Sequence, residues 1–77
     1  MLKPNEQQEF RKFLKRIGRN MRKVRQEKKE TQEAASERIG VVLRYYQRLE
    51  YGDLPITTKN LFRIATRMGV PVERLVS

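Results

Sequence analysis

Apolar residues recur along this chain with the period of an α-helix. In the first third they follow one another at steps of three and four and fall within a stripe roughly 100° wide on a helical wheel. These residues are Phe10, Phe13, Leu14, Ile17, Met21 and Val24. The pattern predicts one long amphipathic helix over about residues 6–28, with Gly18 as a point where it can bend, after a frayed terminus over residues 1–4.

The rest of the pattern predicts four shorter helices, over about residues 32–39, 42–51, 58–68 and 71–76. Thr31 and Thr57 stand where N-caps are expected. Gly40 supplies the positive φ that a tight reversal between two helices requires, and Gly52 ends the helix before it. Pro71 suits the first position of the last helix. Residues 5–77 are therefore expected to form a single all-α domain of five helices.

The helix over about 42–51 has two chemically different faces. Val42, Tyr46 and Leu49 form its apolar stripe. The opposite face carries Leu43, Arg44, Gln47, Arg48 and Tyr51. Arginine pairs with guanine O6 and N7, glutamine pairs with adenine, and an apolar side chain contacts the thymine methyl group. An ordinary solvated helix face would have the same composition, so this helix alone leaves both interpretations open.

The net charge favours the first interpretation. The 77 residues include 18 Lys and Arg against 9 Asp and Glu, a formal charge of +9. Residues 1–29 hold 11 of the basic and 3 of the acidic residues, so they supply nearly all of the excess. A charge of this size predicts an acidic partner, either nucleic acid, an anionic membrane or an acidic protein. The basic face of the first helix either contacts flanking phosphates or is simply solvated; it comprises Arg11, Lys12, Lys15, Arg16, Arg19, Arg22 and Lys23.

Composition also excludes several classes of function. The chain has no Cys and no His, which removes disulfides, thiolate metal sites and the commonest general base. No pair of carboxylates suggests a reaction, so we expect no enzyme activity, metal, cofactor or small-molecule ligand. There is no apolar signal core, and no run approaches the ~18 apolar residues of a membrane span. We therefore expect a soluble, cytoplasmic protein with no membrane partner.

Four segments of the chain resemble a known family. They read IGRNMRKVRQEKKETQ, AASERIGV, YYQRLEYG and TTKNLFRIATRMGVPVERL, and together they span about residues 17–75. In order, spacing and character they resemble the Cro/CI-type (Xre-like) helix-turn-helix family of bacterial and phage transcriptional regulators. The resemblance implies a compact five-helix, lambda-repressor-like domain that binds double-stranded DNA, here with an extended N-terminal helix.

The resemblance also implies roles for individual positions. The residues placed at the base edges of the major groove are Val42, Leu43, Arg44, Gln47 and Arg48. Gln32, Tyr45 and Gly52 would lie beside the DNA backbone. Arg25 and Glu50 match two residues that form an internal ion pair in many family members.

Two positions depart from the family pattern. Val42 stands at the N-cap of the helix over about 42–51, which the resemblance places in the major groove. Ser or Thr is usual there, and an uncapped start loses about 1 kcal/mol of helix stability. Asp53 places a negative charge in a loop that often carries Lys or Asn. We therefore expect no side-chain cap at Val42 and weaker contact with the DNA backbone at Asp53.

A homodimer is expected because one recognition helix reads too few base pairs to discriminate well. Two copies related by a two-fold axis would bind half-sites about one helical turn apart. The candidate interface residues are Phe62, Val70, Val72 and Leu75. Phe62 falls off the apolar stripe of its own helix, although it is an equally good candidate for a core position under the last helix. Phe10, Phe13 and Leu14 either fold back on the same core or pack across a dimer.

Other functions remain open at this point. A basic amphipathic helix over residues 6–29 fits an anionic membrane or an acidic protein. Within the family, the size suits a phage repressor, a restriction-modification controller or an antitoxin-like interaction module. RNA is disfavoured, because the major groove of A-form RNA is too narrow for a helix and this chain offers no aromatic stacking sheet.

Overall fold

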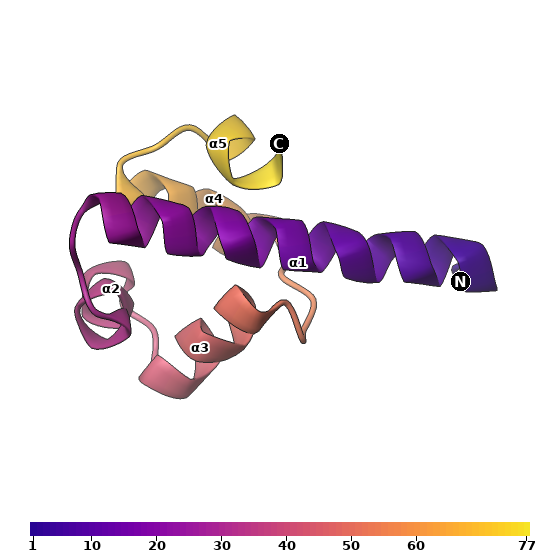
Figure 1. Ribbon diagram of the computed structural model, residues 1–77, viewed down its shortest axis with the longest axis horizontal. Helices are drawn as coiled ribbons and strands as arrows, with labels where there is room; N and C mark the ends of the chain where they lie inside the picture. Colours follow the sequence, from indigo (N-terminus) through magenta and orange to yellow (C-terminus); the bar gives the residue numbers. More distant parts are fainter.

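The computed structural model describes all 77 residues and contains five α-helices and no strand (Figure 1). The helices are α1 (Pro4–Glu27), α2 (Gln32–Ile39), α3 (Leu43–Tyr51), α4 (Thr58–Met68) and α5 (Val72–Val76). The side chains of Thr31 and Thr57 accept hydrogen bonds from the backbone N–H groups of Ala34 and Asn60, as N-caps do. The predicted all-α, five-helix class is confirmed.

The first helix begins earlier than the sequence pattern predicts. Pro4 is its first residue, where a missing N–H costs nothing because no intrahelical acceptor is available there. The backbone N–H of Lys3 donates to Oε1 of Glu6 over 2.8 Å, which fixes the start. The prediction of a frayed terminus through residue 4 is therefore wrong at Pro4.

Helix α1 forms the long axis of a molecule that measures 37 × 23 × 21 Å. Figure 1 shows α2 and α3 on one side of α1 and α5 on the other, with the N-terminal turns of α1 extending past the rest of the body. The strongest packing of α1 is against α3 and α5. The long helix thus separates the helix-turn-helix side of the molecule from its C-terminal side.

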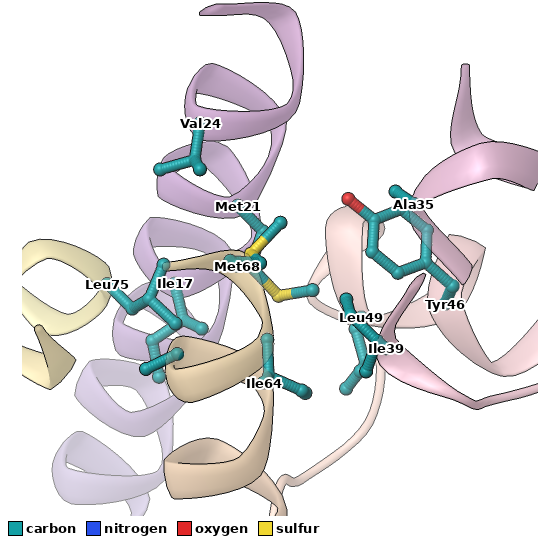
Figure 2. Packing of buried hydrophobic residues seen from close by; sticks show 11 residues of the cluster. Ile17, Met21, Val24, Ala35, Ile39, Tyr46, Leu49, Ile64, Met68 and Leu75 are labelled. Carbon is teal, nitrogen blue, oxygen red and sulfur yellow. The ribbon is translucent and has the colours of Figure 1, made fainter. Parts of the chain in front are cut away.

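One hydrophobic core joins all five helices. Its buried residues are Ile17, Met21, Val24, Ala35, Ile39, Tyr46, Leu49, Ile64, Ala65, Met68 and Leu75. Figure 2 shows these side chains pointing into the space enclosed by the helices. Leu14 is also buried, and Phe13 packs against the cluster. The apolar face of α1 from Phe13 onward therefore folds back on its own core, whereas Phe10 stays exposed.

Gly18 lets α1 and α3 approach closely. A Cβ atom at this position would collide with the carbonyl oxygen of Glu50 and lie 2.6 Å from that of Leu49. Helix α1 continues through Gly18 without interruption. The glycine expected to permit a bend is instead the point where the end of α3 rests on α1.

Two predictions about the C-terminal helix are wrong. Pro71 is the N-cap of α5, with extended backbone angles, and the helix begins at Val72. Leu75 is completely buried in the core, so it is not available to a dimer interface. The side-chain amide of Asn20 donates to the carbonyl oxygens of Leu75 and Ser77, over 2.8 and 2.9 Å, and holds α5 against α1. The short helix α5 therefore contributes Leu75 to the core and does not expose it at the surface.

Candidate nucleic-acid interface

A tight turn at Gly40 joins α2 to α3. Gly40 has φ 84°, in the left-handed region, and its N–H donates to the carbonyl oxygen of Ser36 over 2.9 Å. Nη1 of Arg67 donates to the carbonyl oxygen of Ile39 over 2.6 Å, so the C-terminus of α2 is also tied to α4. The turn therefore holds α3 at a fixed angle to α2 and α4.

The buried face of α3 is formed by Tyr46, Leu49 and Glu50. The opposite, outward face presents Arg44, Arg48 and Tyr51, at i, i+4 and i+7. All three side chains are exposed, Tyr51 at 58%. Tyr51 was absent from the expected base-reading set, although its spacing from the two arginines places it on the same stripe. This face can offer two guanidinium groups and a phenol to a ligand.

Val42 does not belong to the buried stripe on which the sequence pattern places it. Its side chain is 72% exposed, and it is the N-cap of α3 with no side-chain hydrogen bond, as expected for valine at this position. The neighbouring Val41 packs against the core instead. After the left-handed turn at Gly40, Val41 and not Val42 packs against the core. A helical wheel of α3 cannot show this, because both residues precede the helix.

Two half-buried flanks border the exposed face of α3. On the side of α2, Nε2 of Gln47 donates to Oε1 of Gln32 over 3.2 Å, and Leu43 is also half-buried. On the side of α4, Nδ2 of Asn60 donates to the hydroxyl oxygen of Tyr45 over 3.1 Å. Gln47 and Tyr45 are thus oriented by hydrogen bonds to the neighbouring helices.

A buried ion pair lies beneath α3. Nε and Nη2 of Arg25 donate to the two carboxylate oxygens of Glu50, over 2.6 and 3.1 Å. The Glu50 side chain is completely buried, and Nε2 of Gln32 donates to its Oε1 over 3.0 Å. Burial disfavours the charged form of Glu50, but the hydrogen bonds from Arg25 and Gln32 outweigh burial and hold its pKa below the usual range. The two residues expected to pair do meet, and they connect α1 to α3.

Comparison with known proteins bears directly on this arrangement. The model of the family described as helix-turn-helix matches residues 21–75, from the middle of α1 into α5. The chain belongs to this family. It is a DNA-binding, helix-turn-helix regulator of the Xre/Cro–CI type, in agreement with the resemblance seen in the sequence. Searches of curated proteins and of solved structures gave no match.

A second ion pair of this helix-turn-helix domain lies at the surface. Nε of Arg48 donates to Oδ1 of Asp53 over 3.2 Å, and about half of each side chain is exposed. The backbone N–H of Asp53 donates to the carbonyl oxygen of Arg48, so the two residues are held together locally. No hydrogen bond within the protein engages the Nη atoms of Arg48, which are left to a ligand.

Gly52 has a packing role in this domain. It ends α3 with φ 70°, it is buried, and a Cβ atom there would lie 2.6 Å from Cα of Lys15. Glycine is required both by the left-handed backbone and by the close approach of α1. The expected contact between Gly52 and the DNA backbone is therefore wrong for this residue, because α1 covers it. The loop residues that follow it, from Asp53 on, lie closer to solvent.

The remaining apolar candidates divide by exposure. Phe62 on α4 is 64% exposed, so the alternative that it belongs to the core is wrong. Val70 and Val72 are half-buried and pack partly against the core. Of the four residues expected at a dimer interface, only Phe62 offers a large apolar side chain to solvent.

No group of three or more His, Cys, Asp or Glu side chains lies close enough to hold a metal ion. None of the five helices combines the length and the apolar character that crossing a membrane requires.

Proposed function

We propose that this domain is a sequence-specific transcriptional regulator that inserts α3 into the major groove of double-stranded DNA. The observation that carries the proposal is the outward face of α3, where Arg44 and Arg48 are exposed one helical turn apart. The buried ion pair between Arg25 and Glu50 holds the opposite face of this helix against α1. An isolated α-helix fits the major groove, and arginine is the residue that most often reads guanine there.

Each side chain on or beside the outward face of α3 then has a role. Arg44 and Arg48 would each donate two hydrogen bonds to a guanine, and Gln47 would pair with an adenine. Val42 and Leu43, at the N-terminal end that enters the groove first, would contact thymine methyl groups. Tyr51 lies at the other end of the exposed stripe, where its hydroxyl would reach a phosphate.

The two flanks would contact the DNA backbone. Gln32 lies at the first position of α2, where free backbone N–H groups and the helix dipole favour a phosphate. Its amide uses one hydrogen for Glu50 and keeps the other. The hydroxyl of Tyr45 accepts from Asn60 and can still donate its own hydrogen to a phosphate oxygen.

We infer that the domain acts as a homodimer on a palindromic or nearly palindromic operator. Phe62 supports this inference, because its large apolar side chain on α4 is 64% exposed and has no place in the core. Val70 and Val72 would complete a small apolar contact across the two-fold axis. Occupancy of the operator would then depend on protein concentration through dimerisation.

The competing class, a basic amphipathic helix bound to a membrane, has less support. The apolar side chains of α1 that would enter a lipid surface include Ile17, Met21 and Val24, and all three are buried in the core. Binding a membrane through this face would require α1 to leave the domain.

Selection of bound sequences from a random duplex pool tests the proposal directly. We expect a two-fold-symmetric site whose half-sites lie about one helical turn apart. Arg44→Ala should lose preference at one base pair of each half-site, at a cost of about 1–3 kcal/mol. Lys23→Ala, which removes a positive charge from the face of α1 opposite the core, is the control and should keep the selected sequence. A pool that yields no preferred sequence would contradict the assignment of α3.

A further inference from the structure

The N-terminal turns of α1 form an extension that the family match does not include. The match begins at residue 21, whereas α1 begins at Pro4. Figure 1 shows this part of α1 projecting beyond α3 and over the loop that follows it. Residues 4–20 carry five of the 18 basic residues of the chain, and the proposed contacts of α3 leave these residues unused.

An open groove of about 490 Å³ lies between this extension and the loop after α3. Gln7, Arg11 and Lys15 line the groove from α1. Asp53, Leu54 and Pro55 line it from the loop. The groove begins at Gly52, where Lys15 contacts the end of α3, so it continues the surface that α3 would present to DNA.

The face of α1 that points toward α3 is identified by three contacts. Gly18 touches the last carbonyl groups of α3, Lys15 touches Gly52, and Nε of Arg22 lies 3.6 Å from Oε1 of Glu50. At 100° per residue, Arg11 lies on the same face as these residues, about two turns before Gly18. Arg11 and Lys15 therefore point to the side of the molecule on which α3 lies.

These two cations are available to a ligand. Both residues are exposed, and neither is within ion-pair distance of a carboxylate. The one acidic residue that lines the groove, Asp53, is paired with Arg48. The groove thus has an excess of positive charge next to the proposed DNA-binding face.

We propose that Arg11 and Lys15 bind phosphates of the DNA backbone beyond the C-terminal end of α3. This inference rests on the proposed function, because it extends the same interface along the duplex. Double-stranded DNA carries a phosphate about every 3.4 Å along each strand, so a strand that leaves the groove read by α3 offers several phosphates to this extension. The contact adds affinity and length to the site, and it adds no base preference.

The test compares two double variants of the whole chain. Arg11→Gln with Lys15→Gln removes two charges from the groove. Lys12→Gln with Lys23→Gln removes two charges from a face about 90° further around the same helix. Glutamine has nearly the same helix propensity as arginine and lysine, so both variants should keep α1 folded. The two variants have the same net charge. The control also loses the exposed 3.9 Å ion pair between Lys12 and Glu9, which contributes little to stability.

The measurement is the slope of the logarithm of the DNA-binding constant against the logarithm of salt concentration. Each lost phosphate contact should reduce the slope by about 0.9, so the groove variant should lose about 1.8 per protomer. The control variant should lose much less. The groove variant should also weaken binding equally on selected and random duplexes and shorten the protected footprint.

Each other outcome overturns the proposal. An unchanged slope in the groove variant would show that these cations do not reach phosphate, and an equal loss in both variants would show only a general effect of net charge. A slope that stays constant while the groove variant loses binding to anionic lipid vesicles would assign the extension to a membrane. The slope on random duplex DNA does not depend on sequence readout, so the proposal can fail or succeed independently of α3.

Discussion

Glu50 and Arg48 of helix α3 each donate to or accept from an oppositely charged side chain, and the pairs Arg25–Glu50 and Arg48–Asp53 differ in almost every physical respect. Arg25 and Glu50 form a two-point contact, with side chains 14% and 0% exposed. Arg48 and Asp53 form a single contact of 3.2 Å, with side chains 48% and 52% exposed. An arginine–carboxylate pair is therefore a buried contact between α1 and α3 in one place and a solvent-exposed contact in the other.

Burial accounts for this difference. A buried carboxylate that loses its partner remains in a medium that solvates charge poorly, so the loss is expensive even though the intact pair adds little net stability. An exposed pair exchanges freely with water and is screened by salt, so its loss costs between nothing and about 1 kcal/mol. We therefore expect changes at Arg25 or Glu50 to act on folding, and changes at Arg48 or Asp53 to act on DNA binding.

The largest expected effect follows from Arg25→Ala. Glu50 would keep Gln32 as a hydrogen-bond donor and the half-exposed Arg22 at 3.6 Å, but it would lose its closest, buried cationic partner. Breaking a buried pair in this way typically costs about 3–5 kcal/mol, a large fraction of the total stability of a small domain. Urea unfolding followed by circular dichroism would measure the loss. A variant as stable as the parent would show that water reaches Glu50 and would remove the distinction between the two pairs.

The buried pair should also set the acid sensitivity of the fold. The pKa of Glu50 is lower in the folded protein than in the unfolded chain, so its stabilising contribution is complete above the unfolded value of about 4.3. This contribution is lost as the pH falls through the folded pKa. Unfolding free energies measured between pH 7 and pH 3 should therefore decline toward acid.

Glu50→Gln should lower the stability at neutral pH and flatten this decline. Asp53→Asn should preserve it, because Glu50 is still present. If the decline is equally steep in Glu50→Gln and in the parent, another group controls acid unfolding and the buried pair does not.

The sequence predicted the parts of this comparison that depend on local pattern. Thr31, Thr57 and Gly40 mark the helix ends correctly, because capping depends on residues only a few positions apart. The family resemblance alone predicted that Arg25 and Glu50 would pair. The wheel of α3 also separated the buried Tyr46 from the exposed Arg44.

The sequence did not predict features that depend on contacts between distant segments. The sequence predicted that Gly52 lies beside the DNA backbone, but it is covered by Lys15, which lies 37 positions earlier in the chain. Leu75 was predicted to lie at a dimer interface, but it is buried in the core because α5 packs against α1. The pairing of Arg48 with Asp53 depends on the left-handed turn at Gly52, whose direction a helical wheel does not include.

Arg48→Ala should produce the opposite pattern to Arg25→Ala. Its exposed pair contributes at most about 1 kcal/mol, so the urea midpoint should hardly change. Binding to the selected operator should weaken by about 1–3 kcal/mol, with preference lost at one base pair of each half-site. Competition between operators that differ at single positions would measure this. A uniform loss on every sequence would assign Arg48 to the phosphate backbone.

The smallest expected effect is that of Asp53→Asn. The folded state should be as stable as the parent within about 1 kcal/mol, because the lost pair is exposed. On random duplex DNA the variant should bind a few-fold more tightly, because it removes a negative charge next to the proposed DNA-binding face and frees Nε of Arg48 for phosphate. Glu33→Gln on α2 removes the same charge near the interface without releasing an arginine, so it controls for charge alone. A larger gain for Asp53→Asn than for Glu33→Gln would mean that the surface pair restrains Arg48 in the free protein. An equal gain would mean that the pair has no role beyond its charge, and the contrast between the two pairs would then rest on the buried one.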